Sequence, residues 1–386
     1  MSSIYLDNAS TTFIRTNIIL KIKNILKKKI YNSSSLYKKA KNYKMLIEKC
    51  RFIISKYLNV LSNEIFFTSS GTESNNFIIY VSIYVLNVKK IITTKLEHIS
   101  ILKIIAFFVK RKKIKCIFLK VNKKGDINYN YFKKILKDNN EKILVTLMHV
   151  NNEIGNIYDI NLISNICKRY NNVFFHSDIS QSVGHLNFNI NFLDFATISL
   201  HKFHGPLGIG IVYKNQKIFL KNGFILGGSQ ENFLRAGTEN IYSIIGAKEA
   251  FKQSYNNMKY ENKIIRCIKK YCIKKLLLNI KNISFNGNSN NFNKSIDTIL
   301  NIRLPIKNNL LLFTLDKYYK IMISYGSSCN QIDNINIYSH VLKNILNKKY
   351  LYNNTSIRLS FSYLNTKKEI KYFIICLKKI LYNNIN

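Results

Sequence analysis

Lys202 is the residue of this chain with the clearest capacity for covalent chemistry. A predicted strand, Phe195–Leu200, runs directly into this lysine, which is flanked by two histidines and followed by Gly205 and Pro206. Nine of the 14 glycines fall between residues 184 and 246, and glycine marks places where the backbone turns sharply or approaches something closely. A lysine held in such a turn is placed to form a Schiff base with a carbonyl cofactor. Taken alone, Lys202 is better explained as a solvated surface lysine beside a tight turn.

Asp178 ends another apolar strand, predicted over Val173–Ser177. A carboxylate there is costly unless it is paired. A pyridine nitrogen is the partner that such a carboxylate needs in a pyridoxal enzyme, because the carboxylate keeps the ring protonated as an electron sink. Gln181 follows three residues later and can donate to the phenolic oxygen of such a cofactor. The alternative for Asp178 is a simple cap of the next helix.

Gly71 and Thr72 lie where a predicted strand turns into a helix. Free backbone N–H groups and the helix dipole favour a phosphate at such a junction, although a plain helix cap is equally natural. Ser199 and His201, beside the lysine, could reach the same phosphate. His98 could stack on a cofactor ring or only fill the core.

Two residues in the C-terminal third could act on a substrate. Cys329 lies in the small polar loop 324–331, the kind of exposed setting that a nucleophilic thiol requires. Arg358 lies on an apolar strand and suits bidentate capture of a carboxylate, with a structural ion pair as its alternative. The seven cysteines form no Cys-x-x-Cys pair and no ligand cluster with histidine, which fits a reducing compartment and predicts no metal site.

The elements that must position these residues alternate between strand and helix. Such alternation predicts a mostly parallel sheet covered by helices on both faces, an α/β fold with the ligand at the carboxyl ends of the strands. Each polar cluster above follows a strand, as one site would require. The predicted sheet strands are 64–68, 90–94, 114–121, 143–150, 173–177, 195–200 and 209–213.

The chain is long enough for two domains. We expect a large domain over residues 15–255 that binds the cofactor. Residues 1–14 and 256–386 would form a smaller α+β domain that carries the cysteine loop at about 324–338. We expect neither a secretory signal nor a membrane span, and therefore a cytoplasmic protein.

The formal net charge of +40 suggests nucleic-acid binding at first sight. The excess is nearly all lysine, however, and it is spread over the whole chain rather than gathered in one stretch. This distribution predicts nonspecific attraction to polyanions at low salt and no dedicated nucleic-acid site.

With these residues in place, the chain resembles the cysteine desulfurases of the IscS/NifS type. These belong to the class V aminotransferase superfamily and have pyridoxal-phosphate fold type I. The likeness runs almost from end to end, and its most specific parts are the following segments: 5–12, 148–155, 176–184, His201–Lys202 with Gly205–Pro206, 227–231 and 235–240.

The resemblance implies a role for each candidate residue. Lys202 would carry the cofactor, Asp178 would pair with the pyridine nitrogen, and His98 would stack on the ring and act in proton transfer. Asn152 and Gln181 would contact the ring oxygen, with Arg358 and Asn152 on the substrate carboxylate. The phosphate would be held by Gly71, Thr72, Ser199, His201 and, from the other subunit of a homodimer, Thr238.

The implied reaction converts L-cysteine to L-alanine and leaves a persulfide on Cys329. The long loop between Cys329 and Ser339 is typical of the group I enzymes of the family. The persulfide sulfur would pass to an iron–sulfur scaffold or to another acceptor, such as one that serves tRNA thiolation.

Two other functions stay open from the sequence. A class V aminotransferase or selenocysteine lyase would keep the fold and the cofactor but would not need the loop thiol. A basic RNA-associated protein would not need the Schiff-base lysine. The joint presence of Lys202, Asp178, His98, Cys329 and Arg358 favours the desulfurase.

Overall fold

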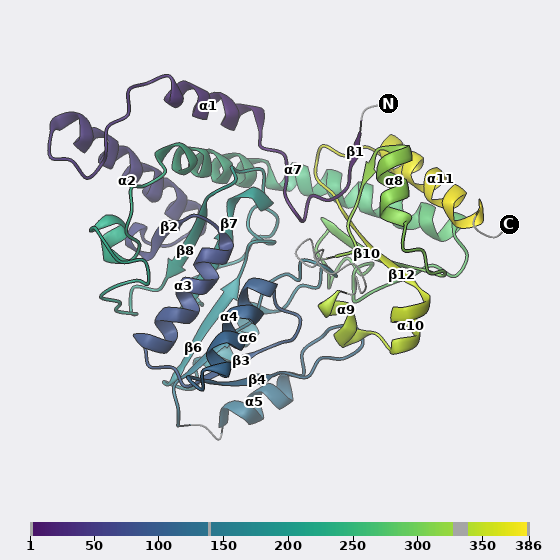
Figure 1. Cartoon of the computed structure of the whole chain (residues 1–386), viewed down its shortest axis with the longest axis horizontal. Coiled ribbons are helices and arrows are strands. Elements are labelled where there is room, and N and C mark those ends of the chain that lie inside the picture. The colour runs from purple at the N-terminus through teal and green to yellow at the C-terminus, as the bar shows by residue number, and fades with distance from the viewer. Residues whose placement is uncertain (1–2, 138–139, 327–338, 384–386) are drawn as a thin grey trace.

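A sheet of seven strands forms the core of the larger half of the molecule (Figure 1). The computed structural model describes residues 3–137, 140–326 and 339–383. The five strands from β7 to β4 are parallel, and β8 runs antiparallel to both of its neighbours. The mostly parallel sheet is therefore confirmed. In spatial order the strands are β2 (Ile65–Thr68), β8 (Gly210–Lys214), β7 (Phe195–Ser199), β6 (Val173–Asp178), β5 (Ile143–Thr146), β3 (Lys90–Thr93) and β4 (Lys115–Phe118).

Helices cover both faces of this sheet. Phe66 of β2 packs with Phe77 on one face, whereas Ile65 and Phe67 belong to the cluster on the other face. Strands buried on both sides need continuous apolar runs, which is why the segments Ile-Phe-Phe-Thr and Ile-Leu-Val-Thr form them. The first face carries α3 (Gly71–Tyr84) and α4 (Ile99–Lys110); the second carries α1 (Thr16–Leu26), α2 (Lys38–Leu58), α5 (Tyr129–Lys137), α6 (Ile160–Cys167) and the first part of α7 (Ile241–Asn279).

The other half of the molecule is built on two small sheets. In one, β10 (Ile299–Leu304) pairs antiparallel with β12 (Thr355–Ser360) and β9 (Ser284–Phe285). In the other, β1 (Ile4–Tyr5) pairs in parallel with β11 (Ile321–Met322), which brings the start of the chain into this half. The helices here are α8 (Leu311–Tyr319), α9 (His340–Ile345), α10 (Lys348–Asn353) and α11 (Lys367–Asn383).

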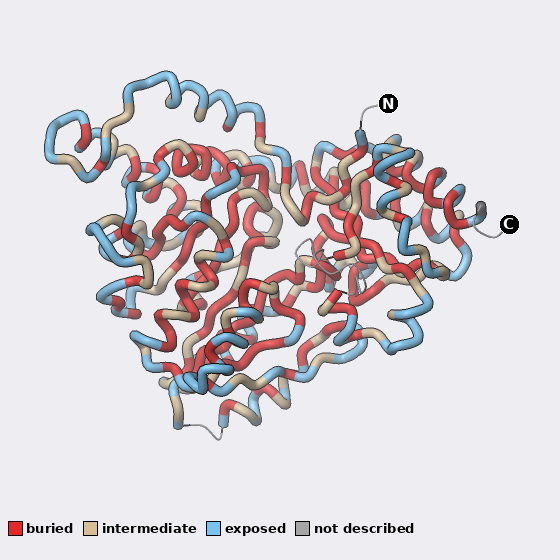
Figure 2. Tube along the Cα trace, viewed as in Figure 1, coloured by how far each residue is buried: buried red, intermediate tan, exposed pale blue. Residues whose placement is uncertain are grey.

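Helix α7 runs across both halves (Figure 1). Its Phe251 belongs to the core under the large sheet, and its Ile265 belongs to a separate core with strands β10 and β12. Figure 2 shows these buried interiors in the two halves. The domain boundary predicted at residue 255 falls inside α7 and stays a prediction. In the described part of the chain, no helix is long and apolar enough to cross a membrane.

Residues 7–12 link the two halves at the carboxyl edge of the large sheet. The Thr12 N–H donates to the carbonyl of His201 at 2.9 Å, and the Asn8 side chain donates to the carbonyl of Ser360 at 2.9 Å. The N-terminal segment thus lies between the end of β7 and the end of β12. Any molecule bound at this edge would be enclosed by both halves.

Candidate active site

A cavity of about 300 Å³ opens at the carboxyl ends of the parallel strands. Its walls come from the segments after β3, β5, β6 and β7, from the start of α3, and from β12 of the small half. Ten of the residues predicted from the sequence line it together: Gly71, Thr72, His98, Asn152, Asp178, Gln181, Ser199, His201, Lys202 and Arg358. The structure thus brings most of the candidate site residues to one place.

Lys202 closes a short 3-10 turn, Leu200–Lys202, directly after β7. Its Nζ donates to the carbonyl oxygens of Ala9 at 3.0 Å and Ser10 at 2.7 Å, so the N-terminal segment holds the amine at the cavity. The turn behind it is tight, because a Cβ on Gly205 would lie 2.7 Å from the carbonyl oxygen of Leu200. Glycine is therefore required at 205, and the lysine is fixed at the end of its strand.

Asp178 is the last residue of β6, and each of its carboxylate oxygens has a defined donor. The Ser180 N–H donates to Oδ1 at 3.0 Å, and Asn75 Nδ2 donates to Oδ2 at 3.0 Å. Residues 179–194, which are all described, form turns and bends without a helix, so Asp178 does not cap one as the alternative required. The bond from Asn75 belongs to the cavity wall. Gln181 donates to the carbonyl of Ala9 at 3.0 Å, so this amide also meets the N-terminal segment.

Helix α3 points its N-terminus at the cavity. Ser70 is the N-cap and accepts from the Glu73 N–H, so the first turn begins at Gly71. A Cβ on Gly71 would lie 3.2 Å from Cβ of Ser199, so the helix start packs closely on the end of β7. His201 contacts Thr11 through Nδ1, and burial, followed by the charge of Lys202, lowers the pKa of His201 to about 4. At neutral pH this imidazole is uncharged and can donate or accept one hydrogen bond.

Arg358 is almost completely buried on β12, yet it reaches the cavity. Its Nη2 donates to Asp7 Oδ1 and to Ser10 Oγ, both at 2.7 Å, and Nη1 donates to the carbonyl of Asn152 at 2.8 Å. The ion pair considered as the alternative is thus present. It orients the guanidinium without using every N–H, since Nε has no partner among the described residues.

His98 caps the start of α4 and lines the cavity. Its pKa is lowered, chiefly by burial; Lys202 and His340 lower it further, and Asp178 acts in the opposite direction. The ring is therefore uncharged near neutral pH.

Three of the cavity residues that were not singled out from the sequence have polar side chains close to His98 or Asp178. Asn75 lies within the polar cluster after β2, Ser100 stands two residues after His98, and His340 begins α9. The polar cluster and the end of the long loop at Ser339 were noted in the sequence, but no spacing marked Asn75 or His340 within them. Ser100 gave no signal at all, because one serine at a helix start is ordinary.

Two predicted site residues are absent from the ten above, for different reasons. Thr238 is exposed and does not line it, and its predicted role concerns a second copy of the chain. Cys329 lies outside the described residues. The described residues on either side of 327–338 both meet Glu153, which is fully buried. Ser339 Oγ donates to Glu153 Oε2, and a Cβ on Gly326 would lie 2.6 Å from the same oxygen.

None of the six described cysteines lines this cavity. Burial raises the pKa of the Cys50 and Cys116 thiols to about 11, and it also raises the pKa of Cys167, Cys272 and Cys376. Thiols with raised pKa values are poor nucleophiles at neutral pH. The described residues also contain no group of three or more His, Cys, Asp or Glu side chains that could hold a metal ion.

The side chains of the cavity fit pyridoxal phosphate. A helix N-terminus suits the phosphate, a carboxylate suits the pyridine nitrogen, and a lysine amine suits the carbonyl. The volume of about 300 Å³ lies within the range of small-molecule sites. The tight contact of Gly71 with β7 leaves no side chain on the first residue of the helix, where an anion would approach.

Comparisons with known proteins agree with this chemistry. The family described as aminotransferase class-V matches residues 4–373. A cysteine desulfurase IscS of Dictyoglomus turgidum is 35% identical over 98% of this chain and 94% of its own length. A cysteine desulfurase IscS of Buchnera aphidicola is 33% identical over 98% of this chain and 93% of its own length.

Solved structures show the same likeness in three dimensions. A NifS-like protein from Rickettsia africae superposes with a TM-score of 0.85 at 31% identity, covering 99% of this chain and all of its own. Another NifS-like protein superposes with a TM-score of 0.88 at 26% identity, again over 99% of this chain and all of its own. The chain therefore belongs to the class V aminotransferase family, among the cysteine desulfurases of the IscS/NifS type.

Proposed function

We propose that this protein binds pyridoxal phosphate, takes sulfur from L-cysteine onto Cys329 and releases L-alanine. The observation that carries the proposal is the convergence of three groups on one cavity: the amine of Lys202, the strand-end carboxylate of Asp178 and the buried guanidinium of Arg358. Each has a common structural explanation alone. Together they match the needs of an amino-acid substrate on a pyridoxal cofactor.

The cofactor, when bound, supplies an electron sink for the bonds at the α-carbon of the amino acid. We assign Lys202 to its carbonyl carbon and Asp178 to its ring nitrogen, where the carboxylate favours the protonated ring. Gln181 and Asn152 are assigned to the ring oxygen, and His98 to the face of the ring. Gly71, Thr72, Ser199 and His201 are assigned to the phosphate at the start of α3.

We assign Arg358 to the carboxylate of L-cysteine, together with Asn152. The contacts with Asp7, Ser10 and the carbonyl of Asn152 fix the plane of the guanidinium before any substrate arrives. A preoriented planar donor loses little entropy when it binds a carboxylate. The substrate is thereby held at the end of the cavity formed by β12.

The sulfur step needs a thiolate, which we assign to Cys329. The thiolate attacks the substrate sulfur, so an S–S bond forms while the C–S bond breaks. The electron pair of the C–S bond stays with carbon, which takes a proton and becomes the methyl group of alanine. L-cysteine and one protein thiol thus give alanine and one persulfide, and no outside oxidant or reductant is needed. The raised pKa values of the buried cysteines support this assignment, because they disfavour those thiols as carriers.

We further propose a cytoplasmic homodimer in which Thr238 reaches the phosphate site of the second copy. Its exposure in the single chain is compatible with such a contact. The persulfide would then supply an acceptor protein for iron–sulfur cluster assembly, with tRNA thiolation as a further use.

The test is release of alanine and sulfide from L-cysteine, with added pyridoxal phosphate and a thiol reductant. Cys329→Ala should abolish sulfide release while the visible absorbance of the bound cofactor stays. Cys267→Ala is the matched control, since Cys267 is exposed and does not line the cavity. Lys202→Ala should remove the absorbance of the lysine-bound cofactor. Sulfide release unaffected by Cys329→Ala would instead favour a lyase, and transfer of the amino group to an oxo acid would favour an aminotransferase.

A further inference from the structure

The hydrogen bonds of His98 fix which ring nitrogen carries its proton. Nδ1 lies 3.2 Å from the backbone N of Ser100 and 2.8 Å from Ser100 Oγ. A backbone N–H can only donate, so Nδ1 must present its lone pair to it. The proton of the neutral ring therefore resides on Nε2.

Asn75 fixes the direction of the second bond. Its Nδ2 donates to Ser100 Oγ at 2.9 Å and to Asp178 Oδ2 at 3.0 Å. The reverse orientation of the amide would set its oxygen against the Asp178 carboxylate, which can only accept. Since Ser100 Oγ accepts from Asn75, its own hydrogen points to Nδ1 of His98. Asn75 is 1% exposed and Ser100 is 8% exposed, so bulk water does not compete well for these bonds.

We propose that Asn75 and Ser100 are positioning residues that hold His98 as the neutral Nε2–H tautomer. His98 then serves the reaction as a hydrogen-bond donor and not as the base. A neutral imidazole accepts a proton only at its lone-pair nitrogen, here Nδ1, which already receives two hydrogen bonds from the start of α4. One of these donors is a backbone N–H that cannot rotate away. We assign the role of base to the amine of Lys202, which lines the same cavity.

This inference deepens the proposed function and rests on it for the identity of the substrate. The charged and titratable groups around His98 are Asp178, Lys202 and His340. Asp178 favours a protonated ring, whereas Lys202, His340 and burial all disfavour it. The bonds from Ser100 favour the neutral ring, because a proton on Nδ1 would break the bond from the backbone N–H and force the hydroxyl hydrogen to turn away.

The first test follows deuterium exchange at the ring carbon between the two nitrogens of His98, by mass spectrometry of the holoenzyme over a range of pH. This exchange reports the pKa of each histidine separately. We expect wild-type His98 to have a low pKa and Ser100→Ala to make it about fivefold easier to protonate, the effect of one net hydrogen bond. Ser100→Thr keeps the hydroxyl and should restore the wild-type value, and Asn75→Ala should shift the pKa in the same direction as Ser100→Ala.

Ser82→Ala is the matched control, a buried serine of α3 that does not line the cavity. It should leave the pKa of His98 unchanged. An ordinary or raised pKa for wild-type His98 would overturn the proposal, and so would an unchanged pKa in Ser100→Ala or an equal shift in Ser82→Ala. No turnover is needed, so the result is decisive for Asn75 and Ser100 even if the chain proves not to be a desulfurase.

The second test is kinetic. If His98 only donates, His98→Gln, which keeps a donor, should retain at least tenfold more alanine formation than His98→Ala. The acidic limb of the pH profile of alanine formation should lie at the same pH in His98→Gln as in the wild type. Loss of that limb in His98→Gln, with rates as low as in His98→Ala, would show that His98 is the base and would overturn the proposed role.

Discussion

Arg358 illustrates how one residue is prepared for its ligand by its neighbours. Lysine in its place would keep a positive charge beside Asp7, but its ammonium group could not also reach Ser10 and the carbonyl of Asn152. We expect Arg358→Lys to raise KM for L-cysteine roughly 10- to 100-fold, the effect of losing a charge-assisted hydrogen bond, while kcat falls less. Steady-state alanine release measures both constants.

Arg303→Lys is the control for this substitution. Arg303 lies on the neighbouring strand β10, bonds to Ser284 and does not line the cavity. It should leave KM unchanged. An unchanged KM in Arg358→Lys would mean that the guanidinium serves only the ion pair with Asp7.

The sequence alone could identify residues whose chemistry is unusual for their place in an element. Lys202 was found because two histidines, a glycine and a proline surround it at the end of a strand. Asp178 was found because an acidic residue that ends an apolar strand needs a partner. Asn75 and Ser100 were not, because their importance comes from distances to His98 and Asp178 that only the folded chain sets. Cys329 stays a sequence-based prediction, since it lies outside the described residues.

At the scale of elements, the seven strands of the large sheet were predictable, and the end of α1 was not. A strand that is buried on both faces of a sheet is a continuous apolar run, so its position can be predicted from the sequence. The apolar spacing over Asn17–Ile30 predicts a helix of that length, but α1 ends at Leu26. Only Ile18 of this helix is buried, so no packing holds a further turn through Lys27–Lys29.

The segments on either side of residues 327–338 converge on Glu153, which predicts a sensitive contact at Gly326. Its φ of 131° suits glycine, and a Cβ there would collide with the Glu153 carboxylate. We expect Gly326→Ala to slow alanine formation about tenfold or more, because a shift of about 1 Å in a catalytic loop is enough for that. The visible absorbance of the cofactor should remain.

Gly208→Ala separates the collision from backbone strain. Gly208 also has a positive φ, 75°, but a Cβ there would meet nothing within 4 Å. It should therefore lose some stability and keep its rate of alanine formation. Equal rates in the two variants would contradict a specific role for the contact with Glu153.

Lys269 of α7 is fully buried and donates to Ser295 and to the carbonyl of Ile296. Burial lowers its pKa to about 7. The unfolded chain holds this proton up to a pH of about 10.4. Between these values the unfolded state binds more protons, so this group makes the free energy of unfolding rise as pH increases above 7.

Lys269→Met should remove this component of the pH dependence. Denaturant titrations at several pH values from 7 to 9 would measure it, with Lys270→Met as the control because Lys270 is the exposed neighbour. We expect a flatter rise in Lys269→Met and an unchanged one in Lys270→Met. The same slope in all three proteins would show that Lys269 keeps its proton when folded.

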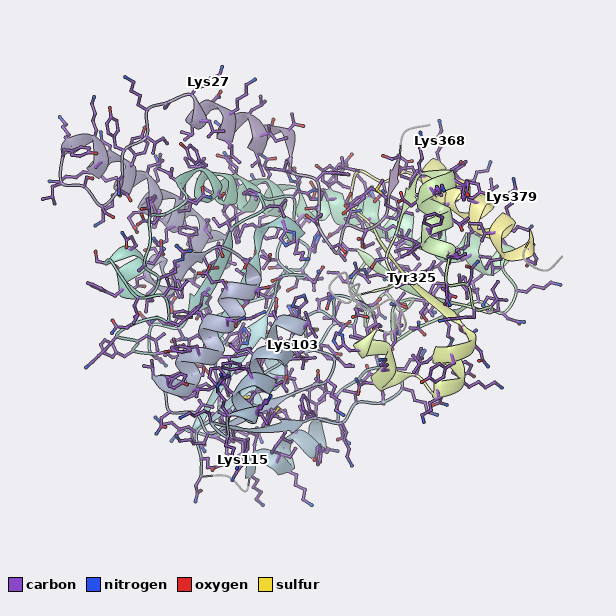
Figure 3. The ribbon with its side chains drawn as sticks, viewed as in Figure 1. Lys27, Lys103, Lys115, Tyr325, Lys368 and Lys379 are labelled. Atoms are coloured by element: carbon purple, nitrogen blue, oxygen red, sulfur yellow. The ribbon has the colours of Figure 1, made fainter. Side chains whose placement is uncertain are left out.

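At the scale of the whole molecule, the basic charge surrounds the fold instead of marking one face. Lys27 at the C-cap of α1, Lys115 of β4 and Lys379 of α11 are all exposed and lie on well-separated parts of the ribbon (Figure 3). A nucleic-acid site would require the charge to be concentrated along a groove or helix. The distribution supports weak attraction to any polyanion and leaves the cavity as the site of specific function.

A chain with 60 basic and only 20 acidic residues must repel itself. At most a third of the basic groups can find an acidic partner, and the remainder favours any expansion of the chain. Salt screens this repulsion, since the Debye length falls from about 10 Å at 0.1 M to about 3 Å at 1 M. We expect the thermal unfolding temperature to rise as sodium chloride increases over that range.

Replacing Lys27, Lys28 and Lys29 by glutamate should raise the unfolding temperature at low salt and flatten its salt dependence. A temperature that falls with salt would mean that the surface ion pairs, such as Lys90 with Glu141, outweigh the repulsion between unpaired lysines.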